Sequence, residues 1–187
     1  DRAAPPRGRR RARCIARGCA ERRIVRVRED ITSLTRDASL GSERVPVRSE
    51  HAATVVDYAP DRVEDGWSHL LRLHHQSRRD SAFGPNEAKL QRAFADTLAV
   101  QNRIWLTTLN VGDSPVAAWY GFAAGDTMCF YQSGRDPAWE QASVGQVLMG
   151  IMIRRAIERG FRTFDFLRGD ESYKATWTSA RRHDQIL

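Results

Sequence analysis

Residues 103–132 read RIWLTTLNVGDSPVAAWYGFAAGDTMCFYQ and carry the strongest fold signal in the chain. Three runs rich in β-branched and aromatic residues are separated by two Gly-Asp pairs, Gly112-Asp113 and Gly125-Asp126. A Gly-Asp pair between such runs is typical of a tight hairpin turn, because glycine readily adopts the positive φ angles that these turns require. The stretch therefore predicts an antiparallel meander of three strands, at residues 103–111, 115–124 and 127–132.

Helical periodicity flanks this meander on both sides. Leu90, Phe94 and Leu98 recur at helical spacing after a proline that suits a first helical turn. After the meander, a polar loop leads to a third helical pattern that ends at Gly160. The order of elements predicts an α/β (α+β) fold with a mixed, twisted sheet flanked by helices. The flanking elements are strands at 53–58 and 161–167 and helices at 62–79, 85–101 and 144–159.

The net charge of +7 is concentrated near the start of the chain. Residues 1–50 hold 14 Arg against 7 acidic residues, whereas residues 51–187 hold 16 basic and 16 acidic residues. The first segment shows little periodicity apart from a possible short strand at 24–28. We therefore predict a basic, poorly ordered or aberrant segment at 1–50 and a folded domain at 51–187.

Composition argues against several classes of partner. No Phe, Trp or Tyr precedes Tyr58, so the basic segment lacks the aromatic side chains that stack on single-stranded nucleic acid. The longest apolar run is far shorter than the roughly 18–20 residues of a membrane helix, and no signal-peptide pattern is visible. Cys14, Cys19 and Cys129 form neither a disulfide framework nor a zinc motif. The expectation is a cytoplasmic protein without a metal or a membrane span.

The first candidate site lies where the predicted loop meets the third helix. Ser143 and Gln146 have the spacing of a capping box, and Gly145 would let a ligand approach the helix backbone closely. A helix N-terminus favours anions, so a phosphate or pyrophosphate group suits this position. The alternative is an ordinary capped helix, because capping boxes are common.

A second candidate site follows the last predicted strand, in FDFLRGDESYKATW at residues 164–177. Asp165 either points into solvent or is held by arginine or backbone partners. Lys174 is one of two lysines beside 28 arginines, and is either a functional ammonium group or simply exposed. Tyr173 is either a proton donor or packs on Trp177.

The whole run of residues 121–177 resembles one family of enzymes. It combines a Gly-Asp hairpin, Tyr-Gln-Ser-Gly, an Asp-Pro-Ala-Trp loop, a Ser-x-Gly helix start, Glu-Arg-Gly, and Phe-Asp-Phe-Leu-Arg-Gly-Asp-Glu followed by Tyr-Lys and Trp. This order resembles the C-terminal half of GNAT-type acyltransferases of the FemAB-like or CelD-like group. A weaker resemblance extends back to about residue 53.

The resemblance implies a GNAT fold and direct acyl transfer from acyl-CoA to an amine or hydroxyl of a sugar or cell-envelope precursor. It places the donor's pyrophosphate at the start of the third helix. The donor-binding residues that it implies are Tyr131, Gln132, Ser133, Ser143, Val144, Gly145 and Gln146. The implied catalytic residues are Asp165, Asp170, Tyr173 and Lys174, and the implied acceptor-binding residues are Arg168, Glu171 and Trp177. The general base stays open among Asp165, Asp170 and Glu171.

Two departures from the family pattern keep alternatives open. The region before the resemblance is short, which predicts a fold that is incomplete at the N-terminus and fits a fragment or a truncated, non-catalytic remnant. The loop also lacks the common R/Q-x-x-G-x-G/A form, since Gln141 and Gly145 are off by one residue. Related FemAB proteins use aminoacyl-tRNA, so a peptidoglycan transferase with that donor is the second alternative.

Overall fold

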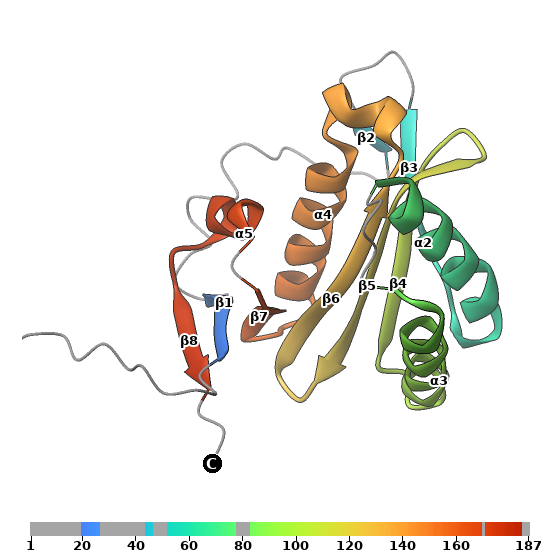
Figure 1. The fold of residues 1–187 in the computed structure, drawn as a ribbon. Helices are drawn as coiled ribbons and strands as arrows, with labels where there is room; N and C mark the ends of the chain where they lie inside the picture. The colour runs from blue at the N-terminus through green and yellow to red at the C-terminus, as the bar shows by residue number, and fades with distance from the viewer. Residues whose placement is uncertain (1–19, 27–43, 47–51, 78–82, 170, 185–187) are drawn as a thin grey trace, which may run out of the picture.

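The computed structural model describes residues 20–26, 44–46, 52–77, 83–169 and 171–184. These ranges contain eight strands and four α-helices (Figure 1). The strands are β1 (Ala20–Arg26), β2 (Arg44–Pro46), β3 (Ala52–Asp57), β4 (Ile104–Val111), β5 (Ser114–Ala124), β6 (Thr127–Arg135), β7 (Thr163–Arg168) and β8 (Arg181–Asp184). The helices are α2 (Val63–Ser77), α3 (Pro85–Val100), α4 (Val144–Glu158) and α5 (Ser172–Trp177), with 3-10 turns at Pro60–Arg62 and Pro137–Ala142.

The strands form one mixed sheet in the order β2-β3-β4-β5-β6-β7-β1-β8. Every neighbouring pair is antiparallel except β6 and β7, which run parallel and are joined through α4. A parallel pair needs such a crossover, whereas β4, β5 and β6 follow one another through tight turns. Both turn glycines, Gly112 and Gly125, have the positive φ that the Gly-Asp pattern predicts.

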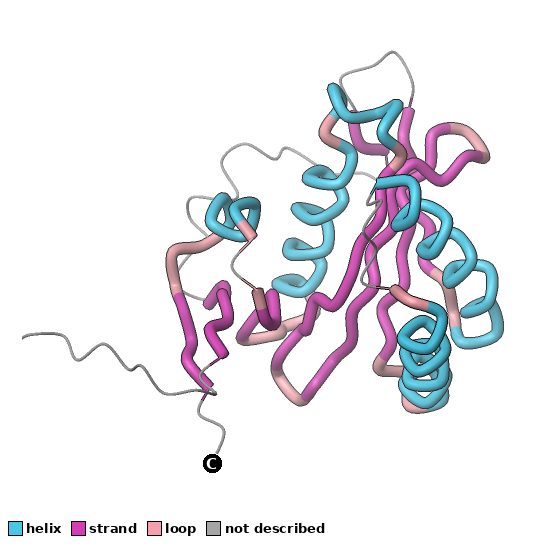
Figure 2. The backbone as a smooth tube through the Cα atoms, in the orientation of Figure 1, coloured by secondary structure: helices cyan, strands magenta, loops and turns pink. Residues whose placement is uncertain are grey.

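Helices cover both faces of the sheet (Figures 1 and 2). One face packs against α4 through a cluster that includes Trp119, Phe130 and Phe164. The other face packs against α2 and α3 through Trp67, Leu70 and Tyr120. Because both faces are buried, β4 and β5 are nearly continuous apolar runs rather than strictly alternating ones.

The parallel pairing between β6 and β7 is short, which opens the sheet. Paired residues extend only from Thr127 with Thr163 to Cys129 with Asp165. Beyond that point, β6 continues for six residues with only β5 as a strand partner among the described residues. The edge of β6 that pairs with β7 therefore loses its strand partner at the middle of β6.

The end of β6 that has no β7 partner packs against α2. His74 is fully buried, and its Nδ1 donates to the carbonyl oxygen of Ser133 at 2.9 Å. The adjacent Gly134 faces the backbone of α2 so closely that a Cβ there would overlap atoms of Leu73 and His74. This contact fixes the end of β6 against the helix without a side chain between them.

The sequence predictions for the helices and the meander are confirmed to within about three residues at each boundary. The strand expected at 24–28 lies at Ala20–Arg26, and residues 27 and 28 are outside the described ranges. Strand β1 pairs with β7 and β8, and β2 pairs with β3, so two strands from the basic segment belong to the sheet. The domain boundary at residue 51 stays a prediction. In the described part of the chain, no helix is both long and apolar enough to cross a bilayer.

Candidate functional site

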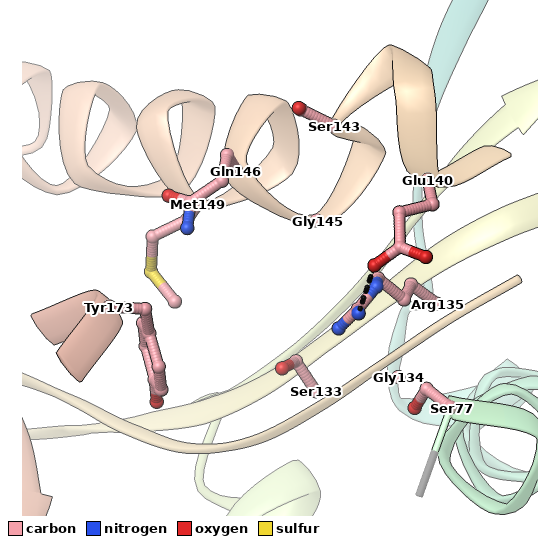
Figure 3. A pocket seen from close by; sticks show the side chains of 10 residues that line it. All are labelled: Ser77, Ser133, Gly134, Arg135, Glu140, Ser143, Gly145, Gln146, Met149 and Tyr173. Carbon is pink, nitrogen blue, oxygen red and sulfur yellow. Dashed lines mark hydrogen bonds and ion pairs between the residues drawn. The ribbon is translucent and has the colours of Figure 1, made fainter. Parts of the chain in front are cut away.

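A pocket of about 390 Å³ lies beside the end of β6 that does not pair with β7 (Figure 3). One wall is β6, the second is the start of α4 with the turn before it, and the third is α5. The pocket is lined by Ser77, Ser133, Gly134, Arg135, Glu140, Ser143, Gly145, Gln146, Met149 and Tyr173.

The register of β6 explains which of its side chains reach the pocket. A bulge lies between the pairs Gly121–Phe130 and Tyr120–Gln132, so β6 has one extra residue there, Tyr131. After the bulge, Ser133 lies opposite Trp119, which faces α4. Ser133 therefore points toward α4 and into the pocket, whereas Tyr131 and Gln132 share the α2–α3 face with Tyr120 and do not line the pocket.

The start of α4 differs from the predicted capping box. Ser143 is in the left-handed region (φ 51°), and its side chain makes no cap hydrogen bond. The physical reason is that Ser143 also ends the preceding 3-10 turn, where its N–H donates to the carbonyl of Glu140. The helix is closed instead by backbone bonds from Gln146 and Val147 to the Ser143 carbonyl. The capping-box prediction is wrong, although the predicted start of the helix at residue 144 is confirmed.

This geometry leaves the amide of Gly145, in the first turn of α4, at the pocket. The amides of Val144 and Gly145 precede the first helical hydrogen bond, which begins at Gln146. A Cβ built on Gly145 would meet only the Arg135 side chain, at 3.6 Å, so the backbone there is open to a ligand. Val144 does not line the pocket, because the residue is fully buried in the core.

A single ion pair stands at the pocket between β6 and the 3-10 turn. Arg135 Nη2 donates to Glu140 Oε1 at 3.2 Å, and both side chains are largely exposed (Figure 3). Exposed pairs of this kind contribute about 0–1 kcal/mol to stability, so Arg135 is readily available to another anion. Together with the α4 amides, it makes this end of the pocket suited to a phosphate group.

The second candidate cluster is only partly brought to the pocket. Tyr173 lines it beside Met149 (Figure 3). Trp177 packs against Gly150 of α4, where a Cβ would meet its ring at 3.3 Å. Asp170 lies outside the described residues. Arg168 and Glu171 are exposed and do not line the pocket.

Asp165 and Lys174 shape the turn between β7 and α5. Asp165 is 3% exposed, and its Oδ1 accepts from the amide of Leu167, a residue with positive φ (55°). Lys174 is 2% exposed rather than solvent-facing. Its Nζ donates to the carbonyl oxygens of Arg168 and Gly169 at 2.8 and 3.3 Å and pairs with Glu171 at 2.7 Å. The Lys174 ammonium group thus stabilises this turn by hydrogen bonds to its carbonyl oxygens, one residue from Tyr173.

We expect a Lys174→Met substitution to lower the free energy of unfolding by about 1–3 kcal/mol, because it removes the charged donor that serves the two carbonyl oxygens. Urea unfolding at constant m-value measures this loss. Glu171→Gln is the matched control: the Glu171 carboxylate is 42% exposed, so its loss costs less than about 1 kcal/mol. Equal losses of unfolding free energy in the two variants would contradict this role of the Lys174 ammonium group.

Five pocket residues are missed by the sequence analysis: Ser77, Gly134, Arg135, Glu140 and Met149. Arg135 and Glu140 lie in the same polar loop as the predicted residues, and their opposite charges at i and i+5 are the one local signal that points to them. Ser77 comes from the end of α2, more than 50 residues earlier, and only the folded sheet brings it here. Within the described ranges, no group of three or more His, Cys, Asp or Glu side chains is placed to hold a metal ion.

Comparisons with known proteins identify a family from the sequence and a shared fold from solved structures. A family model described as an acetyltransferase (GNAT) domain matches residues 40–175. No curated protein matches by sequence.

Solved structures share the fold at low identity. One is an aminoglycoside acetyltransferase from an uncultured soil metagenomic sample, in complex with sisomicin (TM-score 0.53, 16% identity, 72% of this chain and 92% of that chain). Another is the C-terminal domain of a putative lysylphosphatidylglycerol synthetase from Agrobacterium fabrum (TM-score 0.57, 13% identity, 88% and 58%). A third is L-PGS from Bacillus licheniformis (TM-score 0.52, 12% identity, 89% and 60%).

Proposed function

Because the chain belongs to the acetyltransferase (GNAT) family, we propose that it transfers an acyl group from acyl-CoA to an amine or hydroxyl of a sugar or cell-envelope precursor. Within the family, the order of motifs in residues 121–177 supports a place in the FemAB-like or CelD-like group. The observation that carries the proposal is the pocket at the start of α4, where the Gly145 backbone and the Arg135 side chain line the same space.

The pocket residues fit the polar part of such a donor. A pyrophosphate at this place would accept a hydrogen bond from the Gly145 amide and would lie at the positive end of the α4 dipole. Arg135 would exchange Glu140 for a phosphate oxygen, which is a stronger, charge-assisted partner. Gly145 supports this role because a Cβ there would meet only the Arg135 side chain, so the backbone is open to a ligand.

The reactive end of the donor would extend along β6 toward Tyr173. In the reaction, the acceptor nitrogen or oxygen attacks the thioester carbonyl, a bond forms to the acyl carbon, and the C–S bond breaks. The acceptor's proton passes to solvent or to a nearby carboxylate. The departing thiolate takes a proton. We assign the donation of this proton to the hydroxyl group of Tyr173, which lines the pocket.

Calorimetry with acetyl-CoA tests the donor. We expect the full chain to bind acetyl-CoA and CoA with similar, micromolar affinity. The reason is that most of the contacts described involve the phosphate groups, which both ligands carry, rather than the acyl group. Pantetheine, which lacks the pyrophosphate, serves as the control ligand and is expected to bind at least about tenfold more weakly. If folded protein binds none of these at millimolar concentration, the proposed donor is wrong.

We expect Tyr173→Phe to lower kcat for acyl transfer by about 10²-fold while leaving the affinity for acetyl-CoA unchanged, since it removes only the proton donor. Release of free thiol from acetyl-CoA, followed with a thiol reagent, gives the rate. Ser172→Ala, at the exposed neighbouring position of α5, is the control that leaves kcat unchanged. A parallel loss of donor affinity in Tyr173→Phe would show that the phenol binds the donor instead.

A further inference from the structure

The pocket changes in chemical character from one end to the other. At one end, Arg135 and Glu140 form their ion pair beside the open backbone of Gly145. At the other end, Met149 extends from α4 toward Tyr173 of α5 (Figure 3). Among the described residues that line the pocket, Met149 has the only wholly apolar side chain and Tyr173 has the only aromatic ring. A hydrocarbon chain in this pocket therefore has one favourable place, beside these two residues.

Met149 closes the pocket at this end. The residue is only 4% exposed and belongs to the same core cluster as Ile153 and Phe166, and Tyr173 packs against that cluster. Met149 thus fills the space between the pocket and the core. The interior of a protein is packed about as densely as an organic crystal, so it offers no room behind such a side chain. A ligand that extends past Met149 has to displace atoms of the core.

A second layer of contacts holds the aromatic part of this wall in place. The ring of Trp177 lies against α4, where a Cβ on Gly150 would meet it at 3.3 Å. The Lys174 ammonium group donates to the carbonyl oxygen of Arg168 at 2.8 Å and so attaches α5 to the turn after β7. Tyr173 lies on α5 between these two attachments. The Tyr173 side of the wall therefore has little freedom to move away from a longer ligand.

We propose that Met149, together with the ring of Tyr173, limits the acyl group of the donor to a short chain such as acetyl or propionyl. This inference rests on the proposed function and narrows it, because membership of the family does not fix the length of the acyl chain. A methionine side chain is unbranched and extends about three heavy atoms beyond Cβ, the length of a propyl group. An acetyl group lengthened by a propyl group is a pentanoyl group, which would need the space that Met149 occupies.

Calorimetry with donors of different chain length tests the limit in the full chain. CoA, acetyl-CoA and pentanoyl-CoA carry the same phosphate groups and differ only at the sulfur. We expect pentanoyl-CoA to bind at least about tenfold more weakly than acetyl-CoA, because methylene groups that do not fit a closed wall overlap core atoms. Equal affinities of the wild-type protein for acetyl-CoA and pentanoyl-CoA overturn the proposal.

Substitutions at Met149 assign the limit to this side chain. We expect Met149→Ala to bind pentanoyl-CoA at least about tenfold more tightly than the wild-type protein does, and acetyl-CoA with an affinity changed by less than about threefold. The ratio of the two dissociation constants is the readout, because a general loosening of the protein would weaken both ligands. Met149→Leu nearly conserves the side-chain volume and is expected to keep the wild-type ratio. A wild-type ratio in Met149→Ala overturns the proposal.

Met152→Ala is the matched control. Met152 lies on the same helix and in the same core cluster, is fully buried and does not line the pocket. Both alanine variants remove a buried methionine side chain and are destabilising for the same reason, but only Met149→Ala is expected to change the ratio. An equal change in Met152→Ala would show a loosened core and contradict the wall. If Met149→Ala does not fold, Met149→Val removes less of the side chain and is expected to bind butyryl-CoA severalfold more tightly than the wild-type protein; an unchanged affinity overturns the proposal.

The same titrations separate this inference from the proposed function. If CoA and acetyl-CoA bind and pentanoyl-CoA binds as well as they do, the limit on chain length is wrong and the acyltransferase assignment stands. If folded protein binds none of the CoA derivatives at millimolar concentration, the acyltransferase assignment fails and the limit on chain length fails with it. Tight binding of acetyl-CoA and weak binding of pentanoyl-CoA support both.

Discussion

A Gly145→Glu variant is expected to remain folded and to bind acetyl-CoA at least about 100-fold more weakly than the wild-type protein, a difference of about 2.7 kcal/mol. The new side chain would occupy the space beside the first amides of α4 and would bring a carboxylate where a phosphate is expected. Like charges at this distance repel, and the two anions would compete for the same amides and for Arg135. Calorimetry with acetyl-CoA measures the loss.

Stability is expected to move in the opposite direction. A carboxylate in the first turn of a helix interacts favourably with the helix dipole, by about 0.3–1 kcal/mol. Gly145 does not have a positive φ, and a Cβ there makes one ordinary contact, so the backbone accepts a side chain. Gly145→Ala is the matched control and should retain donor affinity within about threefold. Donor affinity that is unchanged in Gly145→Glu would place the phosphate elsewhere.

Gly134→Ala is expected to be strongly destabilising, with a loss of about 3 kcal/mol in the free energy of unfolding. The atoms that a Cβ would overlap belong to the backbone of α2 at Leu73 and His74, and a helix backbone cannot rotate away as a side chain can. Either α2 or the end of β6 must shift. Urea unfolding followed by circular dichroism measures the loss.

The consequence for the site gives this prediction a second readout. Ser133 and Arg135, on either side of Gly134, both line the pocket, so a shift of β6 also disturbs donor binding. Gly84→Ala is the control, because a Cβ there meets nothing within 4 Å and φ is ordinary (−61°). Its expected loss is below about 1 kcal/mol. Comparable losses in the two variants would show that the contact between α2 and β6 is not tight.

Most of the fold follows from local pattern. The two Gly-Asp turns and the periodic spacing of apolar residues identify the meander and three helices, because each signal is complete within about 15 residues. The helix α5 is six residues long, fewer than two helical turns, so its apolar spacing cannot repeat and reveal it. Strand β1 is short and rich in arginine, and its partners β7 and β8 lie at the other end of the chain.

The candidate site is predictable to a smaller extent, for the same reason. Ser133, Ser143, Gly145, Gln146 and Tyr173 lie in the predicted segments and meet at the pocket. The bulge at Tyr131 reverses which face the following residues occupy, and this depends on pairing with β5 rather than on the composition of β6. The burial of Lys174 similarly depends on the path of the turn after β7, which brings two carbonyl oxygens to its ammonium group.

The place of β1 between β7 and β8 has a consequence for how the protein is made. Both partners of β1 are synthesised more than about 130 residues later, and at about 5–20 residues per second the strand waits roughly ten seconds or longer on the ribosome for them. During that time, β1 is an exposed strand beside other nascent chains. Three of its seven residues are arginines, in AERRIVR, and charge of this kind discourages intermolecular strand pairing. The basic character of the segment thus protects a strand that must remain single until β7 and β8 have been made.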